Sequence, residues 1–284
     1  MGISRSEALD CLRSDDLLGI GMEADALRRS LHPQGIVTYQ CVHEIDVSAA
    51  GTSIPAPAHA LRIRCADLTR LDMVADLVRC ARGASDFQWL EVSVPAEAAN
   101  DSRIRDAIAH WAACGSNSIS VDVGWRGDYA RSAAASLVVH RTAHALGMRT
   151  AVGIPFGGGE SDMERLDVLD AVRELQEETC GFMALAPVAI DAPAARELDG
   201  ATAVERLKML AVARMYVDNI DHVRAPQAGA GLKVLQTGLR FGADDAELLQ
   251  PQAGTTEQDL RRVIRDAGLT PVERDGAYTT MFLS

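Results

Sequence analysis

The sequence predicts an α/β fold in which strands and helices alternate, arranged as a full or partial (β/α) TIM-like barrel, with a doubly wound open sheet as the alternative. Short apolar runs alternate with amphipathic stretches along most of the 284 residues. The turns between them are mostly short, and this alternation is typical of parallel strands joined by crossover helices. With 48% hydrophobic residues, the chain can bury a large core.

Six apolar runs are expected to be strands, and five amphipathic stretches between or after them are expected to be helices. The predicted strands are residues 36–40, 61–65, 88–94, 118–123, 149–154 and 181–187. The predicted helices are residues 69–82, 102–113, 131–146, 161–179 and 203–218.

Both ends of the chain add helices to this core. Ser4 and Glu7 have capping-box spacing before an apolar run, and a second helix is expected over residues 16–31, so residues 1–34 form a helical lead-in. Further helices are expected near residues 229–241 and 257–267, followed by an extended tail through Tyr278. Because the sequence contains no internal repeat or low-complexity tract, residues 1–284 are expected to form a single domain.

Charge and hydropathy exclude several classes of partner. The net charge is −12 and the pI is near 5.0, which argues against a nucleic-acid-binding surface. No stretch reaches the apolar length of a membrane span, so no membrane association is expected. The first residues carry no cleavage signature, and we expect a mature cytoplasmic protein.

The six cysteines are scattered along the sequence. They are Cys11, Cys41, Cys65, Cys80, Cys114 and Cys180. No C-x-x-C or C-x-x-x-C spacing occurs, which argues against a local zinc or iron–sulfur site. Most of these cysteines are expected to be small core hydrophobes.

A glycine cluster is the strongest local indication of a ligand site. Gly157, Gly158 and Gly159 precede Glu160, directly after a predicted strand and before a predicted helix. Glycine lets the backbone approach a ligand closely, and the start of a helix favours anionic or polar groups. A tight turn that needs positive φ is the alternative interpretation.

Two other patterns favour structural roles. His140 and His144 are four residues apart, which is metal-ligand geometry on a helix, but the glutamate of a metalloprotease helix is missing. We therefore expect a helix surface packed beside its strand, and no metal site. Asp218 and Asp245 lie near predicted element ends, where carboxylates act as caps or turns more often than as ligands.

Five segments, in order, resemble the futalosine-pathway radical-SAM family. They are VHRTAHALGMRT (139–150), RELQEETCGF (173–182), LAVARMYVDNI (210–220), FGADD (241–245) and the closing stretch from Ile264 to Tyr278. The dehypoxanthine futalosine cyclases are the nearer relatives on these motifs, followed by the aminofutalosine synthases. The resemblance implies a barrel of the radical-SAM type.

The sequence departs from this family in the segment that should bind the iron–sulfur cluster. The family carries C-x-x-x-C-x-x-C after its first strand, whereas this chain has no cysteine between Cys41 and Cys65. Alanine, glycine and proline cannot coordinate iron, so no iron–sulfur cluster is expected. The stretch from Glu44 to Ala135 is shorter than in the family, and residues after Asp245 differ, so the barrel is expected to be trimmed.

The resemblance also implies where a ligand would bind. The Gly157–Glu160 turn aligns with a family turn that lies beside bound SAM, so SAM or a related nucleoside is a candidate ligand, and Glu160 is the candidate catalytic residue. The candidate ligand-binding residues are Gly157, Gly158, Gly159, Glu160, Asp218, Asn219, Gln236 and Asp245.

Three functions remain open at this point. The chain could be a cluster-free pseudoenzyme that binds a small nucleoside-like molecule or regulates a protein partner. It could be an enzyme that performs non-radical acid–base chemistry on a nucleoside-like or SAM-like ligand. Or it could be a dehypoxanthine futalosine cyclase of menaquinone biosynthesis. Fold-level analogy does not decide among them.

Overall fold

Eight parallel strands, alternating with helices along the chain, form the centre of the molecule. The computed structural model describes residues 2–47, 59–84, 87–122, 129–190, 201–226, 231–250, 255–279 and 281–282. The eight strands are β1 (Ile36–Asp46), β2 (Ala60–Arg64), β3 (Trp89–Pro95), β4 (Ser118–Asp122), β5 (Thr150–Phe156), β6 (Phe182–Ala189), β7 (His222–Val223) and β8 (Asp245–Gln250).

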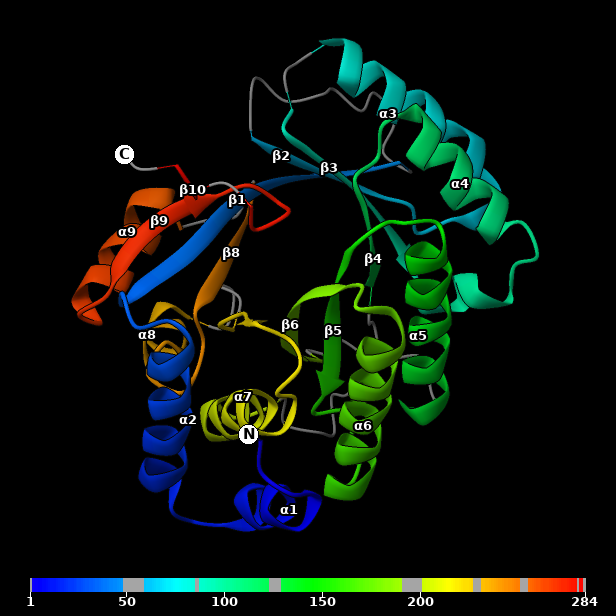
Figure 1. The fold of residues 1–284 in the computed structure, drawn as a ribbon. Helices are drawn as coiled ribbons and strands as arrows, with labels where there is room; N and C mark the ends of the chain where they lie inside the picture. The colour runs from blue at the N-terminus through cyan, green and yellow to red at the C-terminus, as the bar shows by residue number, and fades with distance from the viewer. Residues whose placement is uncertain are drawn as a thin grey trace.

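The strands curl into a partial barrel made of two parallel sheets. In the first sheet β1, β2, β3 and β4 are neighbours, and β8 pairs with the other edge of β1. The second sheet has the order β5-β6-β7. A parallel bridge between Arg224 and Asp245 connects β7 to β8. β4 and β5 lie side by side without a described ladder, so the prediction of a partial barrel is confirmed (Figure 1).

Helices cover the outside of the strands (Figure 1). They are α3 (Leu71–Ala84), α4 (Ile104–Cys114), α5 (Tyr129–Ala145), α6 (Asp162–Thr179), α7 (Ala203–Tyr216), α8 (Leu232–Gly238) and α9 (Glu257–Asp266), with short 3-10 turns η1 (Leu68–Arg70) and η2 (Ala96–Asn100). Capping boxes at Ser161 and Thr202 fix the starts of α6 and α7. The five predicted interstrand helices are confirmed within a few residues.

The two predicted N-terminal helices are present as α1 (Arg5–Arg13) and α2 (Leu17–Leu31). Ser4 and Glu7 form the expected capping box. α1 packs against α6 and α7, and α2 packs against α7, so both form an additional outer layer (Figure 1).

The C-terminal tail adds two strands at the edge of the first sheet. β9 (Thr270–Arg274) runs parallel to the first half of β1, and β10 (Met281–Phe282) pairs antiparallel with β9. The tail was expected to be extended through Tyr278, but Tyr278 has a φ of 59° because the chain turns inward there. This turn brings Arg274 and Tyr278 toward the start of β8.

β7 and β8 were not predicted from the sequence. β8 contains alanine, glutamate and leucine, which favour helices, but it pairs with β1 from Thr38–Asp245 to His43–Gln250. The predicted helix near 229–241 is shorter, as α8, and residues 229 and 230 lie outside the described part of the chain.

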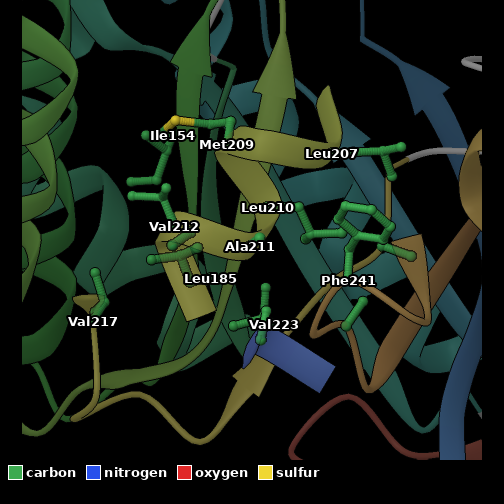
Figure 2. Packing of buried hydrophobic residues seen from close by; sticks show 14 of the residues in the cluster. Ile154, Leu185, Leu207, Met209, Leu210, Ala211, Val212, Val217, Val223 and Phe241 are labelled. Atoms are coloured by element: carbon green, nitrogen blue, oxygen red, sulfur yellow. The ribbon is translucent and has the colours of Figure 1, made fainter. Parts of the chain in front are cut away.

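The outer face of the strands packs against the helices in two separate hydrophobic clusters. In the larger cluster, Met209, Leu210 and Val212 of α7 pack with Ile154 of β5 and Leu185 of β6 (Figure 2). The smaller cluster joins β2, β3 and β4 to α3, α4 and part of α5. Among the described residues, no helix has both the length and the apolar character needed to span a membrane.

Candidate functional site

The inner face of the barrel forms a partly open cavity of about 290 Å³ that is lined by both charged and apolar residues. Alternate residues of a strand point to the same face, so each strand contributes every second side chain to the interior. β1, β2, β3, β4 and β8 contribute charged groups, whereas β5 and β6 contribute small apolar ones. The lining is Glu44, Arg62, Arg64, Glu91, Ser93, Ser120, Val121, Asp122, Ala151, Val152, Gly153, Ala186, Val188, Arg224, Glu247 and Leu249.

Two arginines and two glutamates neutralise one another in the cavity wall. Arg62 Nε donates to Glu91 Oε1 at 2.6 Å, and Arg62 Nη2 donates to Glu247 Oε1 at 2.9 Å. Arg224 Nη1 donates to Glu247 Oε2 at 2.8 Å. Burial opposes charge on Glu247, but Arg62 and Arg224 hold the pKa of its carboxyl below the ordinary value. The Glu247 carboxylate is therefore held in its charged form, and the four groups are mutually paired.

Asp245 anchors this network to the C-terminal tail. Its two oxygens accept from Arg274 Nε and Nη2, each at 2.7 Å, and from Tyr278 Oη at 2.6 Å. Thr38 Oγ1 donates at 2.8 Å and Arg224 Nε at 3.0 Å. Burial alone would raise the pKa of Asp245, but Arg274 and Arg224 lower it below the ordinary value. Asp245, a predicted ligand-binding residue, supports Arg224 and is not in the cavity lining.

Glu44 is the lining carboxylate that accepts no hydrogen bond from a described residue. The nearest cationic atom is Arg62 Nη1, 3.9 Å from its Oε2, and the side chain is 33% exposed. Burial raises the pKa of Glu44 despite the opposing effects of Arg62 and Arg64. Arg64 pairs instead with Asp122, at 2.6 Å.

Among the described residues, the cavity lining therefore has one more carboxylate than guanidinium groups. The described lining contains four carboxylates, on Glu44, Glu91, Asp122 and Glu247, and three guanidiniums, on Arg62, Arg64 and Arg224. The wall also offers a neutral polar atom, because Ser120 Oγ is buried and has no hydrogen-bond partner among the described residues.

The predicted glycine turn is closed by its own glutamate. Gly157 and Gly159 have φ values of 85° and 97°, whereas Gly158 is not in this region. Glu160 accepts from the N–H groups of Gly157 and Gly158 at 2.7 and 2.8 Å and from Arg165 Nε at 2.6 Å. The turn lies at the C-terminal end of β5, as expected, but none of its four residues lines the described cavity.

Asp218 and Asn219 lie at the opposite end of the barrel. They follow α7, and Gln176 Nε2 bridges the carbonyls of Asn219 and Phe182, the first residue of β6. Asp218 accepts from the N–H of Gly2 at 2.8 Å. Gln236 lies on α8, outside the strands. The eight predicted ligand-binding residues therefore lie in four separate places: the Gly157–Glu160 turn, the segment after α7, the helix α8 and the start of β8.

The histidine pair packs α5 against β5. His140 Nδ1 and His144 Nε2 both lie within hydrogen-bond distance of Thr150 Oγ1, at 3.0 and 2.9 Å. Burial lowers the pKa of His140 to about 3, with a further effect from His144. This is the packed helix surface predicted from the sequence.

The arrangement of the cysteines does not fit an iron–sulfur cluster. All six lie within the described residues, but no three of them converge there. Burial also raises the pKa of Cys41 to about 12 and that of Cys65 to about 11, which opposes the thiolate form that binds iron.

The strand order and the inward-facing cavity define the class of protein as an open parallel β/α barrel with a ligand-sized interior. The solved structure of methylornithine synthase has the same fold, with a TM-score of 0.73 and 12% identity, covering 95% of this chain and 94% of that one. No family model matches the chain.

Sequence relatives specify the relationship further. Aminodeoxyfutalosine synthase of Thermus thermophilus is 39% identical over 52% of this chain and 44% of the relative. Cyclic dehypoxanthine futalosine synthase of Streptomyces coelicolor is 33% identical over 50% of this chain and 39% of the relative. The 5-amino-6-(D-ribitylamino)uracil–L-tyrosine 4-hydroxyphenyl transferase of Methanoculleus marisnigri is 34% identical over 50% and 43%.

These relatives confirm the resemblance to futalosine-pathway enzymes. The chain matches less than half the length of each of them. Of the two futalosine enzymes, the aminodeoxyfutalosine synthase has the higher identity, whereas the sequence motifs had favoured the cyclase.

Sequence analysis missed the residues that line the cavity. The pattern that could have identified them is the alternation in β2, where Arg62 and Arg64 interrupt buried Leu61 and Ile63. Arginines at every second position of a strand flanked by helices predict a polar inner face.

Proposed function

We propose that this chain is a cluster-free barrel that binds a small, positively charged or zwitterionic nucleoside-like molecule in its interior, as a pseudoenzyme related to menaquinone biosynthesis. SAM and S-adenosylhomocysteine belong to this ligand class. The proposal rests on the surplus carboxylate of Glu44, which faces the cavity 3.9 Å from the nearest guanidinium.

The shape and chemistry of the cavity support this ligand class. Ala151, Gly153 and Ala186 leave a small apolar wall on β5 and β6 for the flat face of a ring. Glu44 and Ser120 Oγ lie on the polar wall and can accept hydrogen bonds from an amine or a hydroxyl. A volume of about 290 Å³ is at the lower end of small-molecule sites.

The scattered cysteines support a function without a cluster. Anaerobic reconstitution of the chain with iron and sulfide, followed by iron and sulfide assays, is expected to yield no stoichiometric iron. A stoichiometric cluster would favour the cyclase function instead, because radical chemistry in the resembling family depends on that cluster.

Calorimetric titration with SAM, S-adenosylhomocysteine, adenosine and a futalosine-type nucleoside tests the binding function. Glu44→Gln removes the surplus charge, and we expect the affinity for a cationic ligand to fall about 10- to 100-fold, the equivalent of one charge-assisted hydrogen bond. Asp218→Asn is the matched control, since Asp218 lies at the other end of the barrel, and it should leave the affinity unchanged.

Two results would contradict the binding function. One is that none of the four ligands binds, in which case regulation of a protein partner becomes the leading function. The other is a ligand whose affinity falls in Asp218→Asn but not in Glu44→Gln.

Acid–base catalysis is a second candidate, and the raised pKa of Glu44 favours it. A carboxyl that faces the ligand and holds its proton more firmly than usual can exchange that proton with substrate. If Glu44 is a general acid or base, Glu44→Gln should lower turnover of a bound nucleoside by roughly 10²–10⁴-fold with little change in binding. Glu160→Gln should leave turnover unchanged, because both carboxylate oxygens of Glu160 already accept hydrogen bonds from N–H groups of its own turn.

A further inference from the structure

Two histidines and an aspartate converge at the N-terminal ends of β7 and β8, outside the interior cavity. His32 is the residue after α2, His222 begins β7, and Asp244 immediately precedes β8. One ligand atom from each lies within 4.8 Å of the others. Among the described residues, no other three histidine, cysteine or carboxylate side chains meet this criterion.

Both imidazoles approach the same carboxylate oxygen. Nδ1 of His222 lies 2.6 Å from Oδ2 of Asp244, and Nε2 of His32 lies 3.4 Å from it. Two ligand atoms on one tetrahedral ion are roughly 3.4 Å apart when each bond is about 2.1 Å. Small shifts of the side chains would therefore place all three donors on a single ion.

We infer that His32, His222 and Asp244 form a binding site for one divalent transition-metal ion such as Zn²⁺ or Co²⁺. Imidazole nitrogens and a carboxylate oxygen are donors that these ions prefer. The side chains of His32 and His222 are 22% and 19% exposed, so an ion and a water ligand have access from solvent.

The surroundings hold the three donors in place. Asp244 Oδ1 accepts from the N–H of Val223 at 2.9 Å and from Arg214, which leaves Oδ2 directed at the imidazoles. The ring of His222 stacks on Tyr278, with centroids 4.2 Å apart, and on His32 at 5.3 Å. Contacts of this kind orient metal ligands and increase the affinity of a site.

The site lies where two neighbouring strands of the barrel are joined by very little parallel pairing. β7 has only two residues, and the described connection to β8 is the bridge between Arg224 and Asp245. An ion would join α2 to both strands at this point. Because it binds the folded chain, it should also raise the thermal stability by mass action.

A titration of the tag-free chain with Co²⁺ tests the site through the visible absorption of the bound ion. We expect one Co²⁺ per chain, displaced by Zn²⁺, and a rise in Tm with either ion. His32→Ala and His222→Ala should each weaken binding by at least about tenfold, because the loss of a residue that merely orients a metal ligand already costs about 10- to 100-fold. His59→Ala is the matched control, since His59 also lies beside a carboxylate, 3.5 Å from Glu273, but belongs to no such group of three among the described residues.

The titration of the unaltered chain is informative even if a variant fails to fold. The absence of stoichiometric Co²⁺ binding would show that the cluster is only an ion pair between histidine and aspartate. Binding that persists in both folded histidine variants, or that is lost in His59→Ala, would also overturn the assignment. Circular dichroism of each variant identifies loss of fold as the cause of any lost binding.

Discussion

At the scale of single residues, the carboxylate of Glu160 fills the glycine turn that precedes α6. It is fully buried and accepts from two backbone N–H groups and from Arg165. The glycine signal in the sequence located this turn correctly, because Gly157 and Gly159 need positive φ. The direction of the Glu160 side chain could not be predicted, because loop residues lack the fixed alternation that directs Arg62 and Arg64 inward.

Replacing Glu160 should therefore affect stability more than ligand binding. Glu160→Gln removes the charge that pairs with Arg165, and we expect the free energy of unfolding to fall by about 1.5–3 kcal/mol in urea denaturation. Glu164→Gln is the control, since glutamine also completes a capping box and should change stability little. Unchanged stability with weakened nucleoside binding would restore Glu160 as a ligand residue.

At the scale of elements, local signals predicted the helices, whereas pairing across the barrel determined the strands that were missed. Capping boxes and apolar periodicity are encoded within a few residues, so α1 and α6 could be located from the sequence. β8 is a strand only because β1 lies beside it, and no local pattern in Asp245–Gln250 indicates this. The cavity could not be assembled from the sequence for the same reason, since Glu44, Arg62 and Glu247 come from three separate strands.

The packing of α5 on β5 should make stability depend on pH. His140 is buried with a pKa of about 3, against an ordinary value of 6.5, so the unfolded chain binds a proton below pH 6.5 that the folded chain does not. The free energy of unfolding should therefore fall as the pH drops from about 6.5 toward 4. The contribution of His140 approaches about 1.4 kcal/mol per pH unit below its unfolded pKa. His144, whose pKa burial lowers to about 4, acts in the same direction.

Urea denaturation between pH 7 and 5 measures this dependence. His140→Asn should reduce the slope of the unfolding free energy against pH, whatever its effect on stability at pH 7. His110→Asn, at an exposed histidine of α4, should keep the slope of the unaltered chain. Equal slopes for His140→Asn and the unaltered chain would mean that His140 is not kept neutral by its burial.

At the scale of the whole molecule, the two hydrophobic clusters divide the barrel into two units. The smaller cluster joins β2, β3 and β4 to α3, α4 and part of α5, and the larger one joins β1 and the strands from β5 onward to the other helices and the rest of α5. Among the described residues, the units are connected by one ladder, between β1 and β2, and by α5, which has residues in both clusters, whereas β4 and β5 share no described ladder. A unit that shares few contacts with the rest of the protein can unfold by itself while the rest stays folded.

We therefore expect α3 and α4 to open at lower urea concentrations than α6 and α7 in native-state hydrogen exchange followed by mass spectrometry. Two substitutions of buried residues by alanine make the test specific. Each should lower, by about 2–5 kcal/mol, the free energy of any opening that unfolds the cluster to which the residue belongs. Leu169→Ala in α6 should lower the opening free energy of α6 and leave that of α3 and α4 unchanged, because the larger cluster stays packed when the smaller one opens. Ile108→Ala in α4 should lower both, because α6 exchanges only after the smaller cluster has already unfolded. If the four helices instead exchange together at every urea concentration, and both substitutions shift them equally, the barrel is a single cooperative unit despite its divided core.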